Sequence, residues 1–413
     1  MELSATAFVP KPIRIVAIGA GISGIQFLKD ATTRLPNISI TVYDKNSQEG
    51  GTWAENRYPG CACDIPSHAY QYSWNPNPRW SRLYAEAAEI LEYLKSPVTN
   101  FNLRRYIQFS TTCTGANWDE NNSEWNVTLQ RNETPNDEIS VKCDVFIIAI
   151  GRLNNWKLPA IEGLDTFQGR VIHTANWPQG LDHHGKDIAV IGNVASSTQC
   201  LPGLHKDARS IGNFVRGPTW LVPHVHMIKK IGDPQALKAL VPIDYKAGCR
   251  RFTPADKYIE ALNTSNVELI STQIKQVEGN AIITTDDQRR TYDIIVCGTG
   301  FEPYAPRFPI KGRGTANLSD LWTMNGGYES YLAATVAGFP NSFVFNPPIC
   351  PVNGSAYPGI ERTSDYVIRV IDRLQKDRLR SVCVKQSAPR RFQPLGSITH
   401  ARDGLGRTLL IMV

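Results

Sequence analysis

The chain has 413 residues, of which 42% are hydrophobic and 20% charged, and its formal net charge is +6. This composition is typical of a globular protein of two or three domains, and the basic excess is too small and dispersed to indicate a nucleic-acid-binding protein. The longest apolar runs are strand-sized and the N-terminus has no signal-peptide pattern, so we expect a cytoplasmic protein without a membrane span.

A buried strand, a glycine-rich turn and a helix open the chain. Residues 13–18 read as the strand, GAGISG follows as the turn, and the helix extends to about Arg34. A second strand is expected over Ile38–Asp44, which completes a βαβ unit.

The first turn has the spacing of a dinucleotide-binding motif. Gly19 allows the tight turn, Gly21 lets the backbone approach a pyrophosphate, and Gly24 lets the helix pack against the strand. The helix N-terminus offers N–H groups and the positive end of its dipole to the phosphates. Asp44 follows twenty residues after Gly24, where such sites place the acid that binds the ribose, so the unit predicts an adenine dinucleotide.

A segment rich in glycine, proline and aromatic residues runs from Glu49 to Trp74 and is too irregular for a sheet. Its pattern GGTW…NRYPG…CD.PSH.Y..SW resembles the flavin-wrapping segment of class B flavoprotein monooxygenases, in particular the Baeyer–Villiger monooxygenases. The resemblance implies FAD at the first site. The further cofactor-binding residues that it implies are Gly51, Thr52, Trp53, Asp64 and Tyr70.

A helix over 85–98 and strands over 124–130 and 143–151 are expected next. The stretch FQGRVIHTANWP then matches the family fingerprint F-x-G-x-x-x-H-x-x-x-W, at Phe167, Gly169, His173 and Trp177. We interpret these four residues as a linker between two nucleotide-binding domains, in which His173 bonds to backbone and Trp177 fills an apolar seam.

A second βαβ unit begins at Asp187, with the turn GNVASS and a strand that ends at Arg216. Gly192 is present, but Val194 and Ser197 occupy the second and third glycine positions. Val194 is the serious departure, because a β-branched residue disfavours a positive φ and adds bulk where the backbone meets a pyrophosphate. Arg216 stands where NADP sites place a base for the 2′-phosphate. The resemblance implies an NADPH site formed by Gly192, Ser196, Arg216 and Arg250.

The segment GCRRFTPADKYIEAL resembles the family segment that carries the active-site arginine. It implies that Arg250 helps to hold the NADPH phosphate, that Arg251 acts at the flavin and that Asp64 orients Arg251. A fixed guanidinium suits this task because it stabilises negative charge that develops on oxygen. The cysteine spacings, with Cys61 and Cys63 among them, predict no disulfide framework, redox pair or metal site.

The two βαβ units and the resemblance predict an α/β protein with two Rossmann-like dinucleotide-binding domains of the three-layer ββα type. We expect the FAD-binding domain at 10–150 and 303–391, and the NADPH-binding domain at 151–302. A last strand over 290–301 would lead back to the FAD domain. The helical insert near 224–248 is shorter than in the family, and 392–413 is an atypical tail.

The resemblance implies an enzyme that uses FAD, NADPH and O₂ to convert a small-molecule ketone to an ester or lactone, in fungal secondary metabolism, with a polyketide or mycotoxin-type substrate. The particular ketone and the oligomeric state are left open. One alternative is a sibling that hydroxylates nitrogen or sulfur, against which Trp177 argues. The other is a non-catalytic flavin-binding relic or truncated product, which Val194, the short insert and the tail favour.

Overall fold

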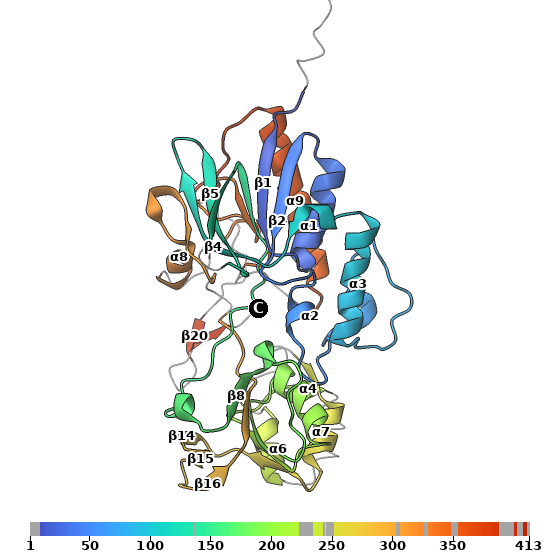
Figure 1. The fold of residues 1–413 in the computed structure, drawn as a ribbon, viewed down its shortest axis with the longest axis vertical. Helices are drawn as coiled ribbons and strands as arrows, with labels where there is room; N and C mark the ends of the chain where they lie inside the picture. The colour runs from blue at the N-terminus through green and yellow to red at the C-terminus, as the bar shows by residue number, and fades with distance from the viewer. Residues whose placement is uncertain are drawn as a thin grey trace, which may run out of the picture. The chain divides into compact units, whose positions relative to one another are not determined.

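The structure is a computed structural model of the chain that describes residues 9–134, 137–222, 234–242, 244, 252–302, 306–324, 329–347, 354–387, 400–402 and 408–410. The chain divides into two compact units (Figure 1). Unit 1 comprises Met1–Glu55, Ile65–Asn155 and Glu302–Gln393. Unit 2 comprises Asn56–Asp64, Trp156–Phe301 and Pro394–Val413.

Unit 1 is built on a five-stranded sheet in the order β19-β7-β1-β2-β3, with every neighbouring pair parallel. Strand β7 is buried along its whole length, as expected for a parallel strand that is covered on both faces. The strands are β1 (Ile13–Ile18), β2 (Ile38–Tyr43), β3 (Ile107–Gln108), β7 (Val145–Ile148) and β19 (Ser342–Val344).

Two helices, α1 (Ile22–Arg34) and α9 (Tyr357–Lys376), pack against each other beside this sheet. A second sheet in the order β18-β4-β5-β6 lies beside it (Figure 1). Apolar side chains of the two sheets pack together in one core. Trp125 of β5 is fully buried in this core and lies 5.3 Å from the ring of Phe146. The strands of the second sheet are β4 (Thr111–Asp119), β5 (Glu124–Arg131), β6 (Glu138–Cys143) and β18 (Ile310–Lys311).

The remaining helices of unit 1 lie in its connections. They are α2 (Thr52–Glu55), α3 (Ala87–Asn100) and α8 (Leu318–Met324). Single turns of 3-10 helix occur at Ser67–Ala69, Arg104–Tyr106 and Arg313–Thr315. In α3 the apolar residues Ile90, Tyr93, Leu94, Pro97 and Val98 are buried, which is the amphipathic period that the sequence shows.

Unit 2 contains a second parallel sheet, in the order β13-β10-β9-β17-β8. Its strands are β8 (Arg170–His173), β9 (Asp187–Ile191), β10 (Ser210–Phe214), β13 (Val267–Ile270) and β17 (Ile294–Cys297). Its helices in the described part of the chain are α4 (Ala195–Leu204), α6 (Pro234–Leu240) and α7 (Asp256–Leu262), with 3-10 turns at Leu164–Thr166 and Thr174–Asn176.

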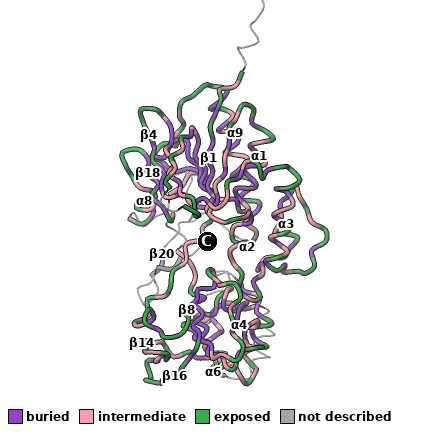
Figure 2. The backbone as a smooth tube through the Cα atoms, viewed as in Figure 1, coloured by how far each residue is buried: buried purple, intermediate pink, exposed green. Residues whose placement is uncertain are grey.

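Smaller sheets complete unit 2. An antiparallel sheet is formed by β14 (Ile274–Glu278), β15 (Ala281–Thr284) and β16 (Arg289–Thr291). Two-stranded pairs are β11 (Leu221–Val222) with β12 (Thr253–Pro254), and β20 (His400–Arg402) with β21 (Thr408–Leu410). Figure 2 shows a buried centre in each unit. The predicted fold, an α/β protein with two Rossmann-like units and a three-layer ββα arrangement, is confirmed.

One strand expectation is wrong. The run 290–301 forms two strands, β16 and β17, that belong to different sheets. The chain turns between them because Tyr292 packs in the core of unit 2, while the Asp293 carboxylate accepts the backbone N–H of Asp187 at 2.9 Å. The break between the two strands lies at a buried tyrosine. An apolar residue of this kind is typical of a strand interior, so the sequence pattern predicted one continuous strand.

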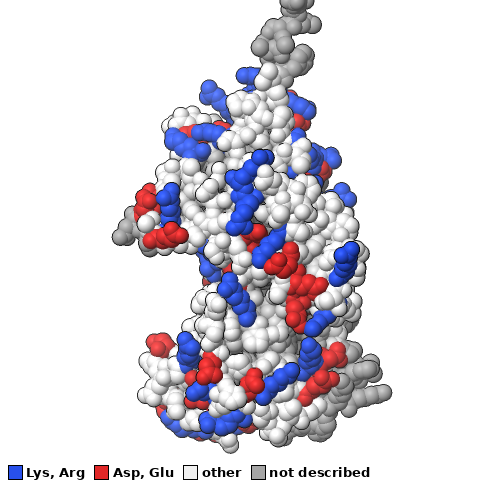
Figure 3. Space-filling model, turned by 45° about the vertical axis from the view of Figure 1, so that its right-hand side comes forward, with Lys and Arg blue, Asp and Glu red and all other residues white. Residues whose placement is uncertain are grey.

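Charged side chains are mixed in sign on the face drawn in Figure 3. On α9, Arg369 pairs with Asp365 at 2.9 Å and Lys376 pairs with Asp372 at 2.8 Å, each one helical turn apart. Among the described residues, no helix has the length and apolar character needed to cross a membrane.

Candidate functional site

The first glycine turn connects β1 to α1. Gly19 has φ +106°, and a Cβ there would lie 2.4 Å from the carbonyl oxygen of Ala149. A Cβ on Gly24 would lie 1.9 Å from the carbonyl oxygen of Gly19. Packing therefore requires glycine at both positions. Gly21 differs, because its φ is −83° and a Cβ there would make only an ordinary contact, 3.4 Å from Cα of Gly51.

The N-terminus of α1 fits an anionic ligand. Its N-cap is Gly21, which has no side chain to cap the helix. The first turn of α1 has no acidic residue. Gly51 has φ +53° and faces this end, since a Cβ on Gly51 would lie 3.0 Å from Cα of Gly21. Two bare backbone segments therefore meet at a helix N-terminus, which is the geometry that binds a pyrophosphate.

Asp44 lies beside this turn and is 5% exposed. Its Oδ2 accepts the backbone N–H of Ala20 at 2.6 Å, and its Oδ1 accepts that of Asn46 at 2.8 Å. Burial raises the pKa of the Asp44 carboxyl, and the two backbone donors oppose that shift. Each carboxylate oxygen still has acceptor capacity for a ribose hydroxyl. The residues present therefore fit an adenine dinucleotide.

Aromatic residues of the predicted flavin-wrapping segment gather near Gly51. Nε1 of Trp53 donates to the Tyr70 hydroxyl at 3.3 Å, and the two rings meet edge to face at 5.6 Å. Tyr357, the first residue of α9, lies 5.0 Å from the Tyr70 ring. Sequence reasoning did not single out Tyr357, although its place before Pro358, at the start of an amphipathic helix, could have indicated it.

The predicted catalytic pair is only partly described. Asp64 is half-buried and belongs to unit 2, whereas the FAD-binding domain was expected to run unbroken over 10–150. Arg250 and Arg251 lie outside the described residues. The roles of these three residues remain predictions.

The second glycine turn connects β9 to α4. Gly192 has φ +116°, and a Cβ there would lie 2.7 Å from the carbonyl oxygen of Gly298. The objection that Val194 needs a positive φ is wrong, since Val194 is an extended N-cap with φ −98° and ψ 179°. Its side chain is 53% exposed and causes no strain. The valine therefore leaves the backbone of the turn intact.

Ser197, at the third glycine position, is fully buried. A Cβ on Gly298 would lie 1.9 Å from its Oγ and 3.1 Å from its Cβ. In the usual motif the third glycine, on the helix, allows close packing. Here Gly298, on the neighbouring segment, allows it instead.

We expect Gly298→Ala to lower the free energy of unfolding by about 1–3 kcal/mol, the usual cost of overpacking. Adding Ser197→Ala removes the clashing Oγ and should recover most of that loss. Urea unfolding of both single variants and the double variant gives the coupling energy, which should exceed about 1 kcal/mol. Strictly additive effects would contradict the packing described.

Buried polar residues that sequence reasoning missed hold this turn. The Nδ2 of Asn213 donates at 3.0 Å to the carbonyl oxygens of both Val190 and Gly192. The Tyr258 hydroxyl donates to Oδ1 of Asn213 at 2.7 Å. An asparagine inside the expected strand SIGNF was the available signal. Arg216 follows β10 and is exposed, and Ser196 lies in the first turn of α4.

The fingerprint residues belong to unit 2 and not to the crossing between units, which is at Asn155–Trp156. Phe167 lies in the core of unit 2, and a Cβ on Gly169 would lie 2.3 Å from the carbonyl oxygen of Asp293. Trp177 is half-buried after a 3-10 turn. The fingerprint therefore describes packing within unit 2, where Phe167 and Gly169 pack at the edge of the sheet.

His173 ends β8 and is buried. Its Nδ1 accepts the backbone N–H of Ala175 at 3.1 Å, and its ring stacks on Trp156 at 5.1 Å. Burial lowers the pKa of His173, which favours the neutral ring. This geometry suits a structural residue at the first turn after the strand.

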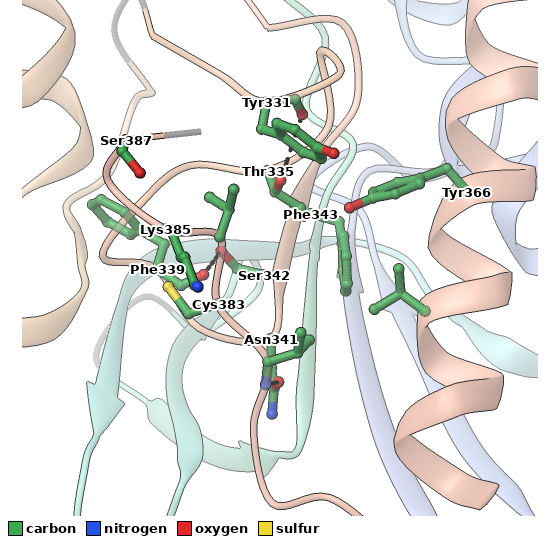
Figure 4. A pocket seen from close by; sticks show the side chains of 13 residues that line it. Tyr331, Thr335, Phe339, Asn341, Ser342, Phe343, Tyr366, Cys383, Lys385 and Ser387 are labelled. Carbon is green, nitrogen blue, oxygen red and sulfur yellow. Dashed lines mark hydrogen bonds between the residues drawn. The ribbon is translucent and has the colours of Figure 1, made fainter. Parts of the chain in front are cut away.

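A cavity of about 330 Å³ lies elsewhere in unit 1, between β19, the loop before it, α9 and the segment after α9 (Figure 4). Tyr366 points toward it from α9, and Phe343 lines it from β19. Its lining ends at Ser387, and none of the predicted site residues contributes to it.

The model of the family described as flavin-binding monooxygenase-like matches residues 12–237. The chain is 34% identical to the FAD-binding monooxygenase moxY of Dothistroma septosporum, over 91% of this chain and 70% of that protein. It is 30% identical to a Baeyer-Villiger monooxygenase of Streptomyces coelicolor, over 87% of this chain and 78% of that protein. The crystal structure of cyclohexanone monooxygenase from Rhodococcus sp. Phi1 bound to NADP+ is similar, with a TM-score of 0.83 and 25% identity, over 92% of this chain and 88% of that one.

Proposed function

This chain belongs to the flavin-binding monooxygenase-like family, and on that premise we propose that it is an FAD- and NADPH-dependent Baeyer–Villiger monooxygenase. The enzyme inserts one oxygen atom of O₂ beside the carbonyl of a small-molecule ketone, which gives an ester or a lactone. The observation that carries the cofactor assignment is the bare N-terminus of α1 between Gly21 and Gly51, with Asp44 beside it. The fingerprint with Trp177 supports the ketone chemistry over hydroxylation at nitrogen or sulfur.

Each of the two glycine turns is assigned one cofactor. We assign FAD to the turn Gly19–Gly24 and NADPH to the turn that begins at Gly192. The domain limits are those proposed from the sequence, except that Asn56–Asp64 belongs to unit 2. When bound, FAD supplies the redox chemistry that takes hydride from NADPH and reacts with O₂. The chain binds the pyrophosphates at two helix N-termini and reads the NADPH 2′-phosphate with Arg216.

Two charged residues are assigned to the oxygen-transfer step. Arg251 would stabilise negative charge on the reacting oxygens with a guanidinium that stays protonated, and Asp64 would orient it by accepting its N–H groups. Placing this charge in advance lowers the barrier because no solvent must reorganise during the reaction. The substrate that we propose is a ketone of secondary metabolism, of polyketide or mycotoxin type, on the resemblance of the sequence to fungal members of the family.

The test is anaerobic mixing of the FAD-loaded protein with NADPH, followed by absorption of the flavin. We expect the visible absorption to bleach, and ketone turnover in ¹⁸O₂ to give a product with one ¹⁸O atom and a new ester bond. Flavin that dithionite reduces but NADPH does not would overturn NADPH-driven catalysis. An N-oxide or sulfoxide as the sole product would overturn the Baeyer–Villiger assignment.

A further inference from the structure

A short segment of the flavin-wrapping sequence belongs to unit 2. The chain leaves unit 1 after Glu55, contributes Asn56–Asp64 to unit 2, and returns to unit 1 at Ile65. Within unit 2 this segment lies against helix α4, the helix that follows the second glycine turn. Its last residue is Asp64, for which the sequence predicts a role at the flavin.

The side-chain amide of Gln199 bonds to both backbone groups of Ala62. Its Nε2 donates to the Ala62 carbonyl oxygen at 3.0 Å, and its Oε1 accepts the Ala62 N–H at 3.3 Å. The same Oε1 accepts the Tyr58 hydroxyl at 2.9 Å. An amide that uses its donor and its acceptor on one residue determines both the position and the orientation of that residue.

Two glycines allow the segment to approach α4 closely. Gly60 has φ +76°, and a Cβ there would lie 2.4 Å from the carbonyl oxygen of Gln199. A Cβ on Gly203 of α4 would lie 2.5 Å from Cβ of Pro59. Neither backbone could carry a side chain at these points, so the contact with the helix is specific.

Tyr58 extends the contact to the first turn of α4. It is buried, and its hydroxyl bonds to Ser196 as well as to Gln199. Burial raises the pKa of Tyr58, so its hydroxyl stays protonated and can donate. Ser196 follows the N-cap Val194 by two residues. Through Ser196 the segment therefore reaches the first turn of α4, which the proposed NADPH pyrophosphate would meet.

We propose that Gln199 is a positioning residue that couples the second dinucleotide site to the segment ending at Asp64. Helix α4 binds the NADPH phosphates at its N-terminus and holds Ala62 through Gln199, so occupancy of the site and order of the segment depend on each other. The consequence for catalysis rests on the proposed function, because it uses the roles assigned there to NADPH and Asp64. The positioning role of Gln199 itself rests on its hydrogen bonds to Ala62 and Tyr58.

The test measures amide hydrogen exchange across residues 57–64 in the FAD-loaded protein, with and without NADP⁺, in wild type and Gln199→Met. Methionine has similar length but cannot bond to Ala62. The loss of these hydrogen bonds costs at least about 1 kcal/mol, so exchange of the segment should accelerate at least about fivefold. NADP⁺ should slow this exchange in the wild type and leave it unchanged in Gln199→Met, whose NADP⁺ dissociation constant should change less than about threefold.

Gln199→Glu adds a readout that a packing role would not move. The ionised carboxylate accepts from Tyr58 and Ala62 but cannot donate to the Ala62 carbonyl, whereas the protonated form regains that donor. Relative to wild type at the same pH, protection of the segment should therefore increase as the pH falls through the carboxyl pKa. Gln288→Glu, an exposed change in the same unit, serves as the control and should show no such dependence.

The outcomes separate the two proposals. If the wild type binds no NADP⁺, the proposed function is wrong and the coupling fails with it. If NADP⁺ binds but exchange over 57–64 is the same in wild type and Gln199→Met, the role of Gln199 alone is overturned. Neither measurement requires ketone turnover, so a failed search for the substrate affects neither result.

Discussion

Replacing Gly21 with alanine is expected to leave unit 1 folded and to reduce its FAD content at least tenfold. The φ of Gly21 is −83°, and the added Cβ would meet nothing nearer than Cα of Gly51 at 3.4 Å. The cost to folding should be no more than about 1 kcal/mol, the scale of a changed N-cap residue. The methyl group would nevertheless project beside the N-terminus of α1, where the pyrophosphate must approach the backbone.

The measurement is the ratio of flavin to protein absorption after purification, together with urea unfolding of the apoprotein. Gly359→Ala on α9 is the matched control, because open space surrounds its Cβ position, and it should keep full FAD content. Gly24→Ala should lose stability as well as FAD, since its Cβ would lie 1.9 Å from the carbonyl oxygen of Gly19. Normal FAD content in Gly21→Ala would refute the placement of the pyrophosphate at this turn.

Replacing Arg216 with glutamine should raise the KM for NADPH by about 10- to 150-fold and leave the KM for NADH nearly unchanged. Arg216 is exposed and follows the carboxyl end of β10, where the adenosine of a bound dinucleotide would lie. A hydrogen bond to a charged group contributes about 1.5–3 kcal/mol, which gives the expected range. The neutral amide keeps hydrogen-bonding capacity but lacks the charge that pairs with the 2′-phosphate.

Arg209→Gln provides the matched control for this change. Arg209 precedes β10 at its other end, and its Nε donates to Asp187 at 2.9 Å. Removing it deletes the same charge at the opposite end of β10 and should change both KM values less than about twofold, because an exposed ion pair contributes little. Steady-state kinetics with each nucleotide give the KM values that check both variants. Equal losses for NADPH and NADH in Arg216→Gln would rule out recognition of the 2′-phosphate.

The second glycine turn shows where sequence reasoning was too strict. The motif requires glycine at its second position without distinguishing backbone conformation from ligand access. Gly21 and Val194 both have negative φ, so the turn itself accepts a side chain there. The positive φ occurs at the first glycine, at +106° in Gly19 and +116° in Gly192. Sequence spacing could not separate the conformational demand at one position from the need for ligand access at the other.

The sequence by itself determined the parts that depend on neighbours along the chain. The parallel strands, the amphipathic helices, the two turns and the acid Asp44 follow from periodicity and spacing, because each βαβ unit forms from contiguous residues. GAGISG with its downstream acid also predicted the dinucleotide, because such a pattern specifies a ligand contact within one unit. The family followed from the resemblance of the segment Glu49–Trp74 and of FQGRVIHTANWP.

Only the tertiary structure decided the contacts between segments distant in sequence. It placed Asn56–Asp64 in unit 2 through Gln199, it compensated Ser197 with Gly298, and it divided 290–301 between two sheets. These outcomes depend on complementary shape and on buried hydrogen-bond partners that only the folded chain brings together. Spacing along the sequence specifies which groups are available, and packing determines which of them meet.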